Sequence, residues 1–288
     1  MGIKGTYQIG LYEKAIPQEI GWRERLKIAK DAGFDYLEIS IDETEARMSR
    51  LDWNKEEIEQ LRKIQEEEGI YIESLCLSAQ RKYPLGSQKW EKEAKELMRK
   101  AILFAKQMGI RYIMLSGYDC YYEESSDECS SLRFDKNIKE ATCFAASQGV
   151  MLGIETMEND FMNTIEKAMK SVKFVDSPYL TVYPDLGNIT NGTRDILMDI
   201  ESGKGHIVAA HLKETVPGKF REIPYGTGDV NFPAGIAKLY GQGVRRFVAE
   251  FWYCGEEKWK KIVADNRKFL DEQFLKAEQL LPQMYVAG

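Results

Sequence analysis

Hydrophobic and polar residues follow one another along the chain in a unit that recurs five times. In each copy a segment of helical character ends in glycine, one apolar residue follows, and a run with the character of a strand comes next. The glycine supplies the left-handed backbone conformation that commonly closes a helix. The five copies are Ala32–Ile39, Glu68–Leu75, Met108–Leu115, Gln148–Glu155 and Gln242–Glu250. Repeated helix-to-strand joints of this kind predict βα units and a parallel sheet.

Three further apolar runs complete the predicted strands, at Gln8–Leu11, Leu180–Tyr183 and Ile207–Ala210. The helices are predicted at Gly21–Ala32, Trp53–Glu68, Gln88–Met108, Phe134–Gln148, Thr164–Val175, Arg194–Ser202, Phe232–Gln242 and Lys258–Leu281. Eight alternating strands and helices predict an α/β protein, a (β/α)₈ TIM barrel, with residues 1–288 in a single domain and a frayed tail at 282–288. An open doubly wound sheet is the alternative. Such a sheet normally carries a glycine-rich phosphate turn after its first strand, and Gly10–Lys14 does not have that character.

Composition narrows the class of protein. Apolar residues make up 43% and charged residues 30% of the chain, which is typical of a soluble globular protein. No apolar run approaches the ~20 residues that span a bilayer, and the N-terminus lacks the core of a signal peptide. The net charge of −6 argues against an extended nucleic-acid surface. Five cysteines, an odd number without a CxxC pair, indicate reduced thiols in a cytoplasmic protein.

Both histidines of the chain, His206 and His211, flank the predicted strand Ile207–Ala210. An odd separation along a strand points two side chains to opposite faces, and five steps of roughly 3.3 Å put them about 17 Å apart. They are therefore not expected to share one site. His211 stands at the end of the apolar run, where a barrel carries its chemistry. We interpret His206 as a structural residue at the beginning of the strand.

Polar residues end each of the last four predicted strands. They are Glu155, Asp185, His211 and Glu250, separated by 30, 26 and 39 residues, about one βα unit each. In a barrel these positions lie side by side on the active face. Three carboxylates and an imidazole would repel one another without a cation, so the set predicts one divalent metal ion. The oxygen-rich set favours Mn²⁺ or Mg²⁺, and the imidazole keeps Co²⁺ and Zn²⁺ as alternatives.

Several blocks of sequence resemble one known family. They are Gly10–Pro17, Cys76–Ser87, Gly117–Tyr122, Gly153–Met157, Tyr183–Asn188, His211–Thr215, Phe220–Gly228 and Val248–Trp252. Together they are similar to the sugar-phosphate 3-epimerase branch of the xylose-isomerase-like barrels. These are the L-ribulose-5-phosphate (L-xylulose-5-phosphate) 3-epimerases, which are also known as hexulose-6-phosphate isomerases. The resemblance runs nearly from end to end and implies a metal held by Glu155, Asp185, His211 and Glu250, with Mn²⁺ the first choice.

The chemistry of such an epimerase assigns further roles. Inverting C3 of a ketose requires that a proton next to the C2 carbonyl leaves and returns to the opposite face. A metal that chelates O2 and O3 would stabilise the cis-enediolate. Two carboxylates on opposite faces would exchange roles as base and acid. We expect Glu155 and Glu250 to be this pair, as the resemblance also implies, with Asp185 and His211 mainly metal ligands.

The resemblance also implies contacts with a sugar-phosphate substrate. Glu158 and Arg221 are expected to bind substrate hydroxyls, although a surface carboxylate and a loop salt bridge are equally consistent with the residues alone. Asn188 occupies a position where non-phosphorylated ketose epimerases carry a substrate-binding histidine, which favours the phosphate branch. Lys213 is expected to touch the ligand or to neutralise a carboxylate in the barrel mouth. The polar block with Arg81, Lys82 and Ser87 is expected to supply the phosphate contacts.

Other functions share parts of this pattern. A free-ketose 3-epimerase, a hexulose-phosphate isomerase or a keto-inositol dehydratase would use the same metal and enediolate. A nucleic-acid enzyme that resembles endonuclease IV would need a multi-zinc site rich in histidine, which two histidines do not supply. A non-catalytic sugar-binding barrel would not require Glu250. No nucleic-acid or membrane partner is expected, and a homodimer is an expectation that rests only on how frequently this scaffold assembles.

Overall fold

The computed structural model describes residues 3–121 and 124–286. Its eight strands are β1 (Gln8–Tyr12), β2 (Tyr36–Ile41), β3 (Tyr71–Leu77), β4 (Tyr112–Ser116), β5 (Met151–Glu155), β6 (Leu180–Tyr183), β7 (Ala210–Leu212) and β8 (Arg246–Ala249). They form one parallel sheet in the order β6-β5-β4-β3-β2-β1-β8-β7. Parallel bridges from Val182 to Ile207 and from Asp185 to His211 join β6 to the β7 side. The predicted TIM barrel is therefore confirmed.

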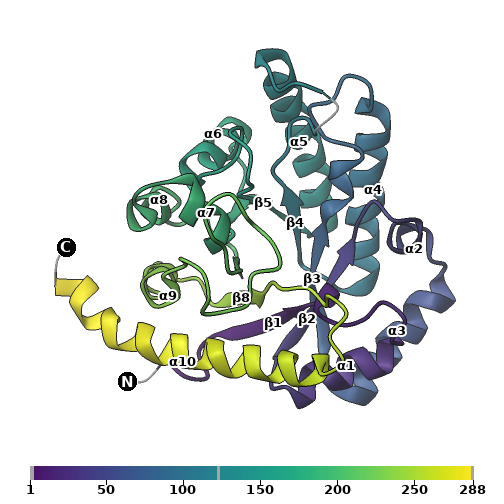
Figure 1. The fold of residues 1–288 in the computed structure, drawn as a ribbon. Coiled ribbons are helices and arrows are strands. Elements are labelled where there is room, and N and C mark those ends of the chain that lie inside the picture. Colours follow the sequence, from purple (N-terminus) through teal and green to yellow (C-terminus); the bar gives the residue numbers. More distant parts are fainter. Residues whose placement is uncertain (1–2, 122–123, 287–288) are drawn as a thin grey trace.

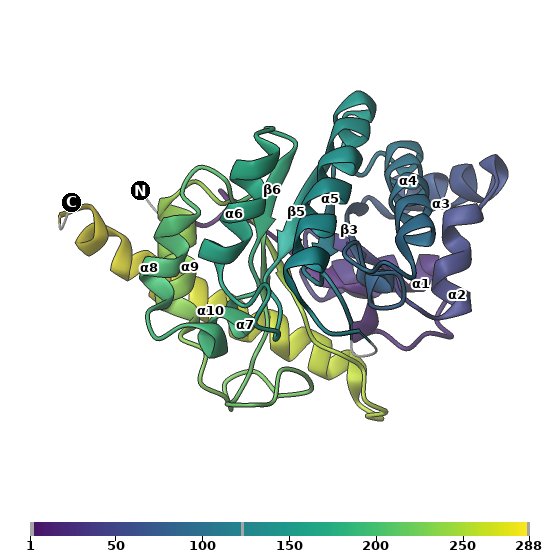
Figure 2. The ribbon, with the colours of Figure 1, turned by 90° about the horizontal axis from the view of Figure 1, so that it is seen from above.

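Helices cover the outside of the barrel. They are α1 (Trp22–Asp31), α2 (Glu45–Met48), α3 (Lys55–Glu68), α4 (Glu91–Met108), α5 (Glu128–Gln148), α6 (Ile165–Val175), α7 (Leu186–Gly192), α8 (Ile196–Ser202), α9 (Phe232–Gly241) and α10 (Trp259–Val286). Short 3₁₀ turns follow β1 (η1, Glu13–Ala15), α2 (η2, Ser49–Asp52) and β3 (η3, Ser78–Arg81). The long α10 runs along the outside of the barrel past β8 and packs on α9 (Figure 1). Figure 2 shows α1 to α5 on one side of β5 and β6, with α6, α8 and α9 on the other.

Large side chains fill the inside of the barrel below the strand ends. The buried set comprises Tyr12, Tyr36, Cys76, Tyr112, Met114, Tyr183, Ala209 and Val248. The Tyr36 hydroxyl donates to the carbonyl of Phe247 at 2.9 Å, so the ring reaches from β2 toward β8. Gly10 makes room for it, because a Cβ there would lie 2.3 Å from the Tyr36 ring. The filled interior leaves the carboxyl ends of the strands as the place for polar chemistry.

The seventh strand differs from its prediction. The strand begins at Ala210, and Ile207 joins the barrel only through its bridge to Val182. His206 lies before that bridge with an exposed side chain, and its carbonyl accepts a hydrogen bond from the Val182 amide at 2.7 Å. The prediction of a strand over 207–210 was wrong because the chain meets β6 only at separate points there. His206 thus contributes to the barrel through its backbone, and its structural role stays an interpretation.

Several helices also differ from the prediction, and the short α2 was not predicted. α7 was not predicted, because its seven residues contain two glycines and begin directly after β6. α5 begins at Glu128, six residues before the predicted start, because Asp127 and Ser130 form a capping box there. α10 continues beyond Leu281 to Val286. Residues 287–288 of the expected tail lie outside the described residues.

Candidate metal centre and active site

The four polar residues at the strand ends meet in one buried cluster. Glu155 is the last residue of β5, Asp185 precedes α7, His211 lies in β7, and Glu250 follows β8. One ligand atom from each lies within 4.8 Å of the others. The four residues are at most 6% exposed. The four residues, spaced by about one βα unit each, therefore come together in the barrel as the sequence predicted.

Local structure aims the Asp185 carboxylate at the centre of this cluster. Asp185 caps α7, and its Oδ1 accepts the Asn188 amide at 2.6 Å. Its own amide donates to Thr156 Oγ1 at 3.0 Å, which ties the end of β6 to the residue after β5. Oδ2 of Asp185 and Oε2 of Glu250 are buried and make no well-aligned hydrogen bond among the described residues, and their polar contacts are ion pairs with Lys213 and His211. Buried carboxylate oxygens with so few hydrogen bonds are suited to binding a cation.

Lys213 supplies the positive charge closest to these oxygens. Its Nζ lies 3.2 Å from Asp185 Oδ2 and 3.5 Å from Glu250 Oε2. Burial lowers the pKa of Lys213, but the two carboxylates outweigh this effect and raise that pKa above its usual value. Burial would likewise raise the pKa of Glu250, but Lys213 and His211 hold that pKa well below the usual value. Lys213 therefore neutralises carboxylates of the barrel mouth, one of its two expected roles.

The other two carboxyl groups are affected mainly by burial. Burial raises the pKa of Asp185 well above its usual value, and it raises the pKa of Glu155 as well. One lysine and one imidazole do not fully compensate three buried carboxylates. The donor set of three carboxylates and one imidazole fits a divalent cation with mixed oxygen and nitrogen preference. The residues thus fit the implied metal, and the cluster does not by itself select one ion.

Each ring nitrogen of His211 has a carboxylate partner. Nδ1 lies 2.9 Å from Oε1 of Glu155 and 3.3 Å from Oε2 of Glu250, within the cluster. Nε2 lies 2.7 Å from Oε1 of Glu38, a fully buried residue of β2. Glu38 was not among the residues predicted from the sequence. A signal was present, because this glutamate interrupts the otherwise largely apolar strand Tyr36–Ile41.

The residues predicted to contact substrate follow the strands that carry this cluster, Glu158 after β5, Asn188 after β6 and Arg221 after β7. The Asn188 side chain donates to the Thr156 carbonyl at 2.7 Å, and its buried Oδ1 has no hydrogen-bond partner among the described residues. Both carboxylate oxygens of Glu158 lie 2.8 Å from the Tyr118 hydroxyl, which donates to this carboxylate. The Arg221 guanidinium lies 6.0 Å from the centroid of the Trp252 ring. These groups supply donors and acceptors at the mouth of the barrel.

The predicted phosphate residues separate into two positions. The Arg81 side chain ends η3, lies 3.7 Å from a Glu43 oxygen, and has a buried Nε without a hydrogen-bond partner among the described residues. Burial raises the pKa of the Tyr12 and Tyr118 phenols, and the positive charge of Arg81 lowers both less strongly. Ser87 is instead engaged at the start of α4, where its hydroxyl donates to Glu124 and accepts the Trp90 amide. Arg81 thus lies near Tyr12 and Tyr118, whereas the Ser87 hydroxyl is engaged by Glu124 and Trp90.

A family model described as xylose isomerase-like TIM barrel matches residues 26–273, most of the chain. The chain belongs to the xylose isomerase-like TIM barrel family. Two curated relatives carry the name L-ribulose-5-phosphate 3-epimerase UlaE. The protein of Salmonella paratyphi A is 40% identical over 272 residues, covering 93% of this chain and 95% of that protein. The protein of Salmonella paratyphi C is 42% identical over 263 residues, covering 90% and 89%. The resemblance seen in the sequence blocks is confirmed.

Several solved structures share the same barrel. A D-tagatose 3-epimerase-like protein superposes with a TM-score of 0.78 at 16% identity, covering 94% of this chain and 98% of that chain. An L-ribulose 3-epimerase superposes with a TM-score of 0.75 at 15% identity, covering 96% and 98%. D-psicose 3-epimerase of Clostridium cellulolyticum H10, with D-tagatose, gives 0.71 at 19% identity, covering 96% and 97%. At these identities the likeness shows the fold.

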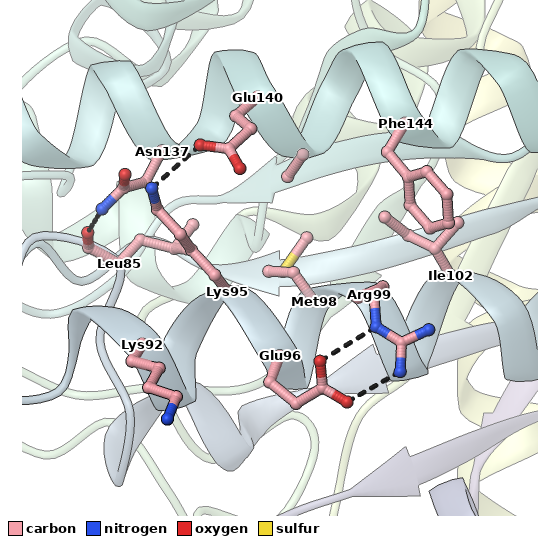
Figure 3. A pocket seen from close by; sticks show the side chains of 11 residues that line it. Leu85, Lys92, Lys95, Glu96, Met98, Arg99, Ile102, Asn137, Glu140 and Phe144 are labelled. Carbon is pink, nitrogen blue, oxygen red and sulfur yellow. Dashed lines mark hydrogen bonds and ion pairs between the residues drawn. The ribbon is translucent and has the colours of Figure 1, made fainter.

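Two cavities of this family member flank the candidate site. One of about 620 Å³ is lined by Tyr118 and Glu158, and one of about 290 Å³ is lined by Lys213, Glu250 and Trp252. A third cavity, of about 440 Å³, lies between α4 and α5 on the outer wall (Figure 3). Its side chains form their own ion pairs, Lys95 with Glu140 at 2.9 Å and Arg99 with Glu96 at 2.8 Å. The outer cavity contains none of the residues at the strand ends.

Among the described residues, no helix combines the length and apolar character needed to cross a membrane.

Proposed function

We propose that the protein is a metal-dependent epimerase that inverts C3 of a ketopentose 5-phosphate, with L-ribulose 5-phosphate and L-xylulose 5-phosphate as the interconverted pair. One observation carries the proposal. Glu155, Asp185, His211 and Glu250 converge in a chain that is 40% identical, over 93% of its length, to a relative named for this activity. The relatives supply the reaction, and the buried cluster supplies the groups that the reaction needs.

Glu155, Asp185, His211 and Glu250 would hold one divalent cation, with Mn²⁺ as our first choice and Mg²⁺, Co²⁺ or Zn²⁺ as alternatives. When bound, the cation would supply a Lewis acid that stabilises the negative charge developed at the substrate C2 carbonyl. Asp185 Oδ2 and Glu250 Oε2, whose polar contacts among the described residues are ion pairs and not well-aligned hydrogen bonds, support this assignment. Lys213 would hold the carboxylates charged and in place, through its contacts of 3.2 and 3.5 Å.

Glu155 and Glu250 would move the proton. They stand on β5 and β8, which are separated in the barrel by β6 and β7, so they approach a substrate from different directions. One carboxylate would remove the C3 proton as a base while the other delivers a proton to the opposite face. For the reverse reaction the roles exchange. Their environments differ, because burial raises the pKa of Glu155 whereas Lys213 lowers the pKa of Glu250. The two carboxyl groups therefore differ in proton affinity.

The residues around the cluster would orient the sugar. Asn188 would accept a hydroxyl at its free Oδ1, and Glu158 would do so at the carboxylate that Tyr118 holds in place. Arg221, beside Trp252, would approach from the loop after β7. These contacts explain how the C3–H bond would be turned toward one carboxylate at a time.

Arg81 is our proposed phosphate contact. A guanidinium binds phosphate through paired hydrogen bonds, and the Nε of Arg81 is a buried donor that no described residue uses. Glu43, at 3.7 Å, is too distant for a strong hydrogen bond and leaves this group available. Ser87, whose hydroxyl serves Glu124 and Trp90, takes a supporting place in the loop.

The test is a substrate panel. L-ribulose 5-phosphate, L-xylulose 5-phosphate, their D counterparts and the free ketoses are incubated with Mn²⁺-loaded protein, and the products are identified by NMR. The proposal expects the two L-phosphates to interconvert and the free ketoses to react much more slowly. A product isomerised at C1 and C2, a dehydrated product, or equal rates with free ketoses would each overturn the assignment.

A further inference from the structure

Glu38 is a buried carboxylate inside the barrel that the proposed reaction does not use. It is 0% exposed and lies in β2, whereas its partner His211 lies in β7. These strands are separated by β1 and β8 in the sheet, so the contact crosses the interior of the barrel. The two residues are 173 positions apart in the chain. A carboxylate buried at this depth requires donors that hold it there.

Three donors meet the Glu38 carboxylate. Oε1 lies 2.7 Å from Nε2 of His211. Oε2 accepts the hydroxyl of Ser74 at 2.8 Å and the hydroxyl of Tyr183 at 3.0 Å. A carboxylate is an acceptor only, and both ring nitrogens of His211 face one, because Nδ1 lies 2.9 Å from Glu155. A cation held by the cluster would take the lone pair of Nδ1, so the remaining ring proton would stay on Nε2, where Glu38 accepts it.

The opposite nitrogen then points into the ligand cluster. Nδ1 of His211 lies 2.9 Å from Glu155 and 3.3 Å from Glu250. With Nε2 protonated, Nδ1 of the neutral ring is the nitrogen with a lone pair to offer a cation. Tyr183 restrains the ring as well. Its own ring packs edge-on against His211 with 5.0 Å between centroids, while its hydroxyl donates to Glu38.

From these contacts we infer that Glu38 is a positioning residue, which fixes the tautomer and ring orientation of His211 for the metal. The inference rests on the proposed function in that a divalent cation must bind the cluster. Histidine ligands of metal sites usually donate their second N–H to a carboxylate or carbonyl, and loss of that partner typically weakens metal binding about 10–100-fold. Tyr183 and Ser74 hold Glu38 in turn, and Tyr183 stands two residues before the ligand Asp185.

The first experiment measures Mn²⁺ affinity. Wild type, Glu38→Gln and Tyr183→Phe are titrated with Mn²⁺ by equilibrium dialysis, and Kd is compared with the circular dichroism and thermal midpoint of each metal-free protein. Glu73→Gln is the matched control, because Glu73 is a glutamate of the neighbouring β3 that pairs with Arg246. We expect Glu38→Gln to weaken Mn²⁺ binding about 10–100-fold. We expect Glu73→Gln to bind like wild type and Tyr183→Phe to fall between the two.

The second experiment reads the tautomer in the wild-type protein. The chain has only two histidines, so ¹⁵N-histidine labelling gives two ring systems, and His211→Asn assigns them. In the Mg²⁺-loaded protein we expect His211 to carry its proton on Nε2. A protonated Nδ1, or a Glu38→Gln variant that binds Mn²⁺ like wild type, overturns the inference and leaves the proposed function standing. A wild-type protein that binds no divalent cation refutes the metal-dependent function itself.

Discussion

The Nζ atom of Lys213 lies 3.2 Å from Oδ2 of Asp185, at the centre of the ligand cluster. This ammonium compensates a carboxylate that a divalent cation would also compensate. We therefore predict that Lys213→Met destabilises the metal-free protein by about 3–5 kcal/mol, because a buried carboxylate loses its partner. The Mn²⁺-loaded variant should recover part of that loss. Thermal denaturation with and without Mn²⁺ tests this, and a metal-induced rise in Tm equal to that of wild type would contradict it.

Arg81 should decide between phosphorylated and free sugars. A charge-assisted hydrogen bond contributes about 1.5–3 kcal/mol, so Arg81→Met should lower kcat/KM for L-ribulose 5-phosphate about 10–100-fold. The rate with free L-ribulose should change little. Lys92 is exposed on α4, and Lys92→Met is the control that should resemble wild type. An equal loss for both sugars in Arg81→Met would remove Arg81 from the phosphate contact.

Gly187 should be required for the geometry of the Asp185 ligand. A Cβ at this position would lie 2.7 Å from the Lys213 carbonyl and 3.2 Å from Oδ1 of Asp185. Gly187→Ala should therefore cost about 1–3 kcal/mol of unfolding free energy and weaken Mn²⁺ binding. Gly21→Ala is the matched control, because no atom lies within 4 Å of its added Cβ. Denaturant unfolding and metal titration of both variants check this, and equal behaviour of the two would show that the close approach is not limiting.

Glu13 should make stability depend on pH. Burial raises its pKa, but Arg50 and Arg25 outweigh this effect and lower it below the usual 4.5. A lowered pKa in the folded state means that Glu13 stabilises the fold above pH 4.5, and that this contribution disappears as the pH falls below that value. Glu13→Gln should lose about 3–5 kcal/mol at pH 7, because the arginines are left unpaired.

Urea unfolding of wild type and Glu13→Gln at a series of pH values measures this linkage. The difference between the two should shrink as the pH falls below 4.5. Glu67→Gln, which breaks an exposed pair with Arg23, should have little effect at any pH. A difference that stays constant down to the acid unfolding of wild type would show that the charge of Glu13 is not responsible.

Much of this site could be predicted because each ligand follows its own apolar run. Glu155, Asp185 and Glu250 close such runs, and a barrel brings the ends of neighbouring strands together whatever the loops between them. The bounds of β7 could not be predicted from the same pattern. The apolar run 207–210 has strand character, but its pairing with β6 is limited to separate bridges, which only the assembled barrel determines.

Glu38 illustrates what a linear sequence does not contain. Its chemistry depends on a partner in β7, which is 173 residues away, and on hydroxyls from β3 and β6. The position of a polar residue within a strand does not indicate which residues it contacts across the barrel. The short α7 was missed for a related reason, since its start is determined by the Asp185 cap and not by a periodic apolar face. Mn²⁺ as the native ion, a cytoplasmic location and a homodimer stay predictions.

Exchange of the substrate C3 proton with solvent deuterium tests the central claim most directly. Mn²⁺-loaded wild type is incubated with L-ribulose 5-phosphate in D₂O, beside Glu155→Gln and Glu250→Gln variants whose metal content is measured. Removal of a general acid or base lowers rates about 10²–10⁴-fold. The account predicts deuterium at C3 of the wild-type product and the loss of exchange in both variants. Epimerisation without deuterium at C3, or wild-type exchange in either metal-loaded variant, would contradict it.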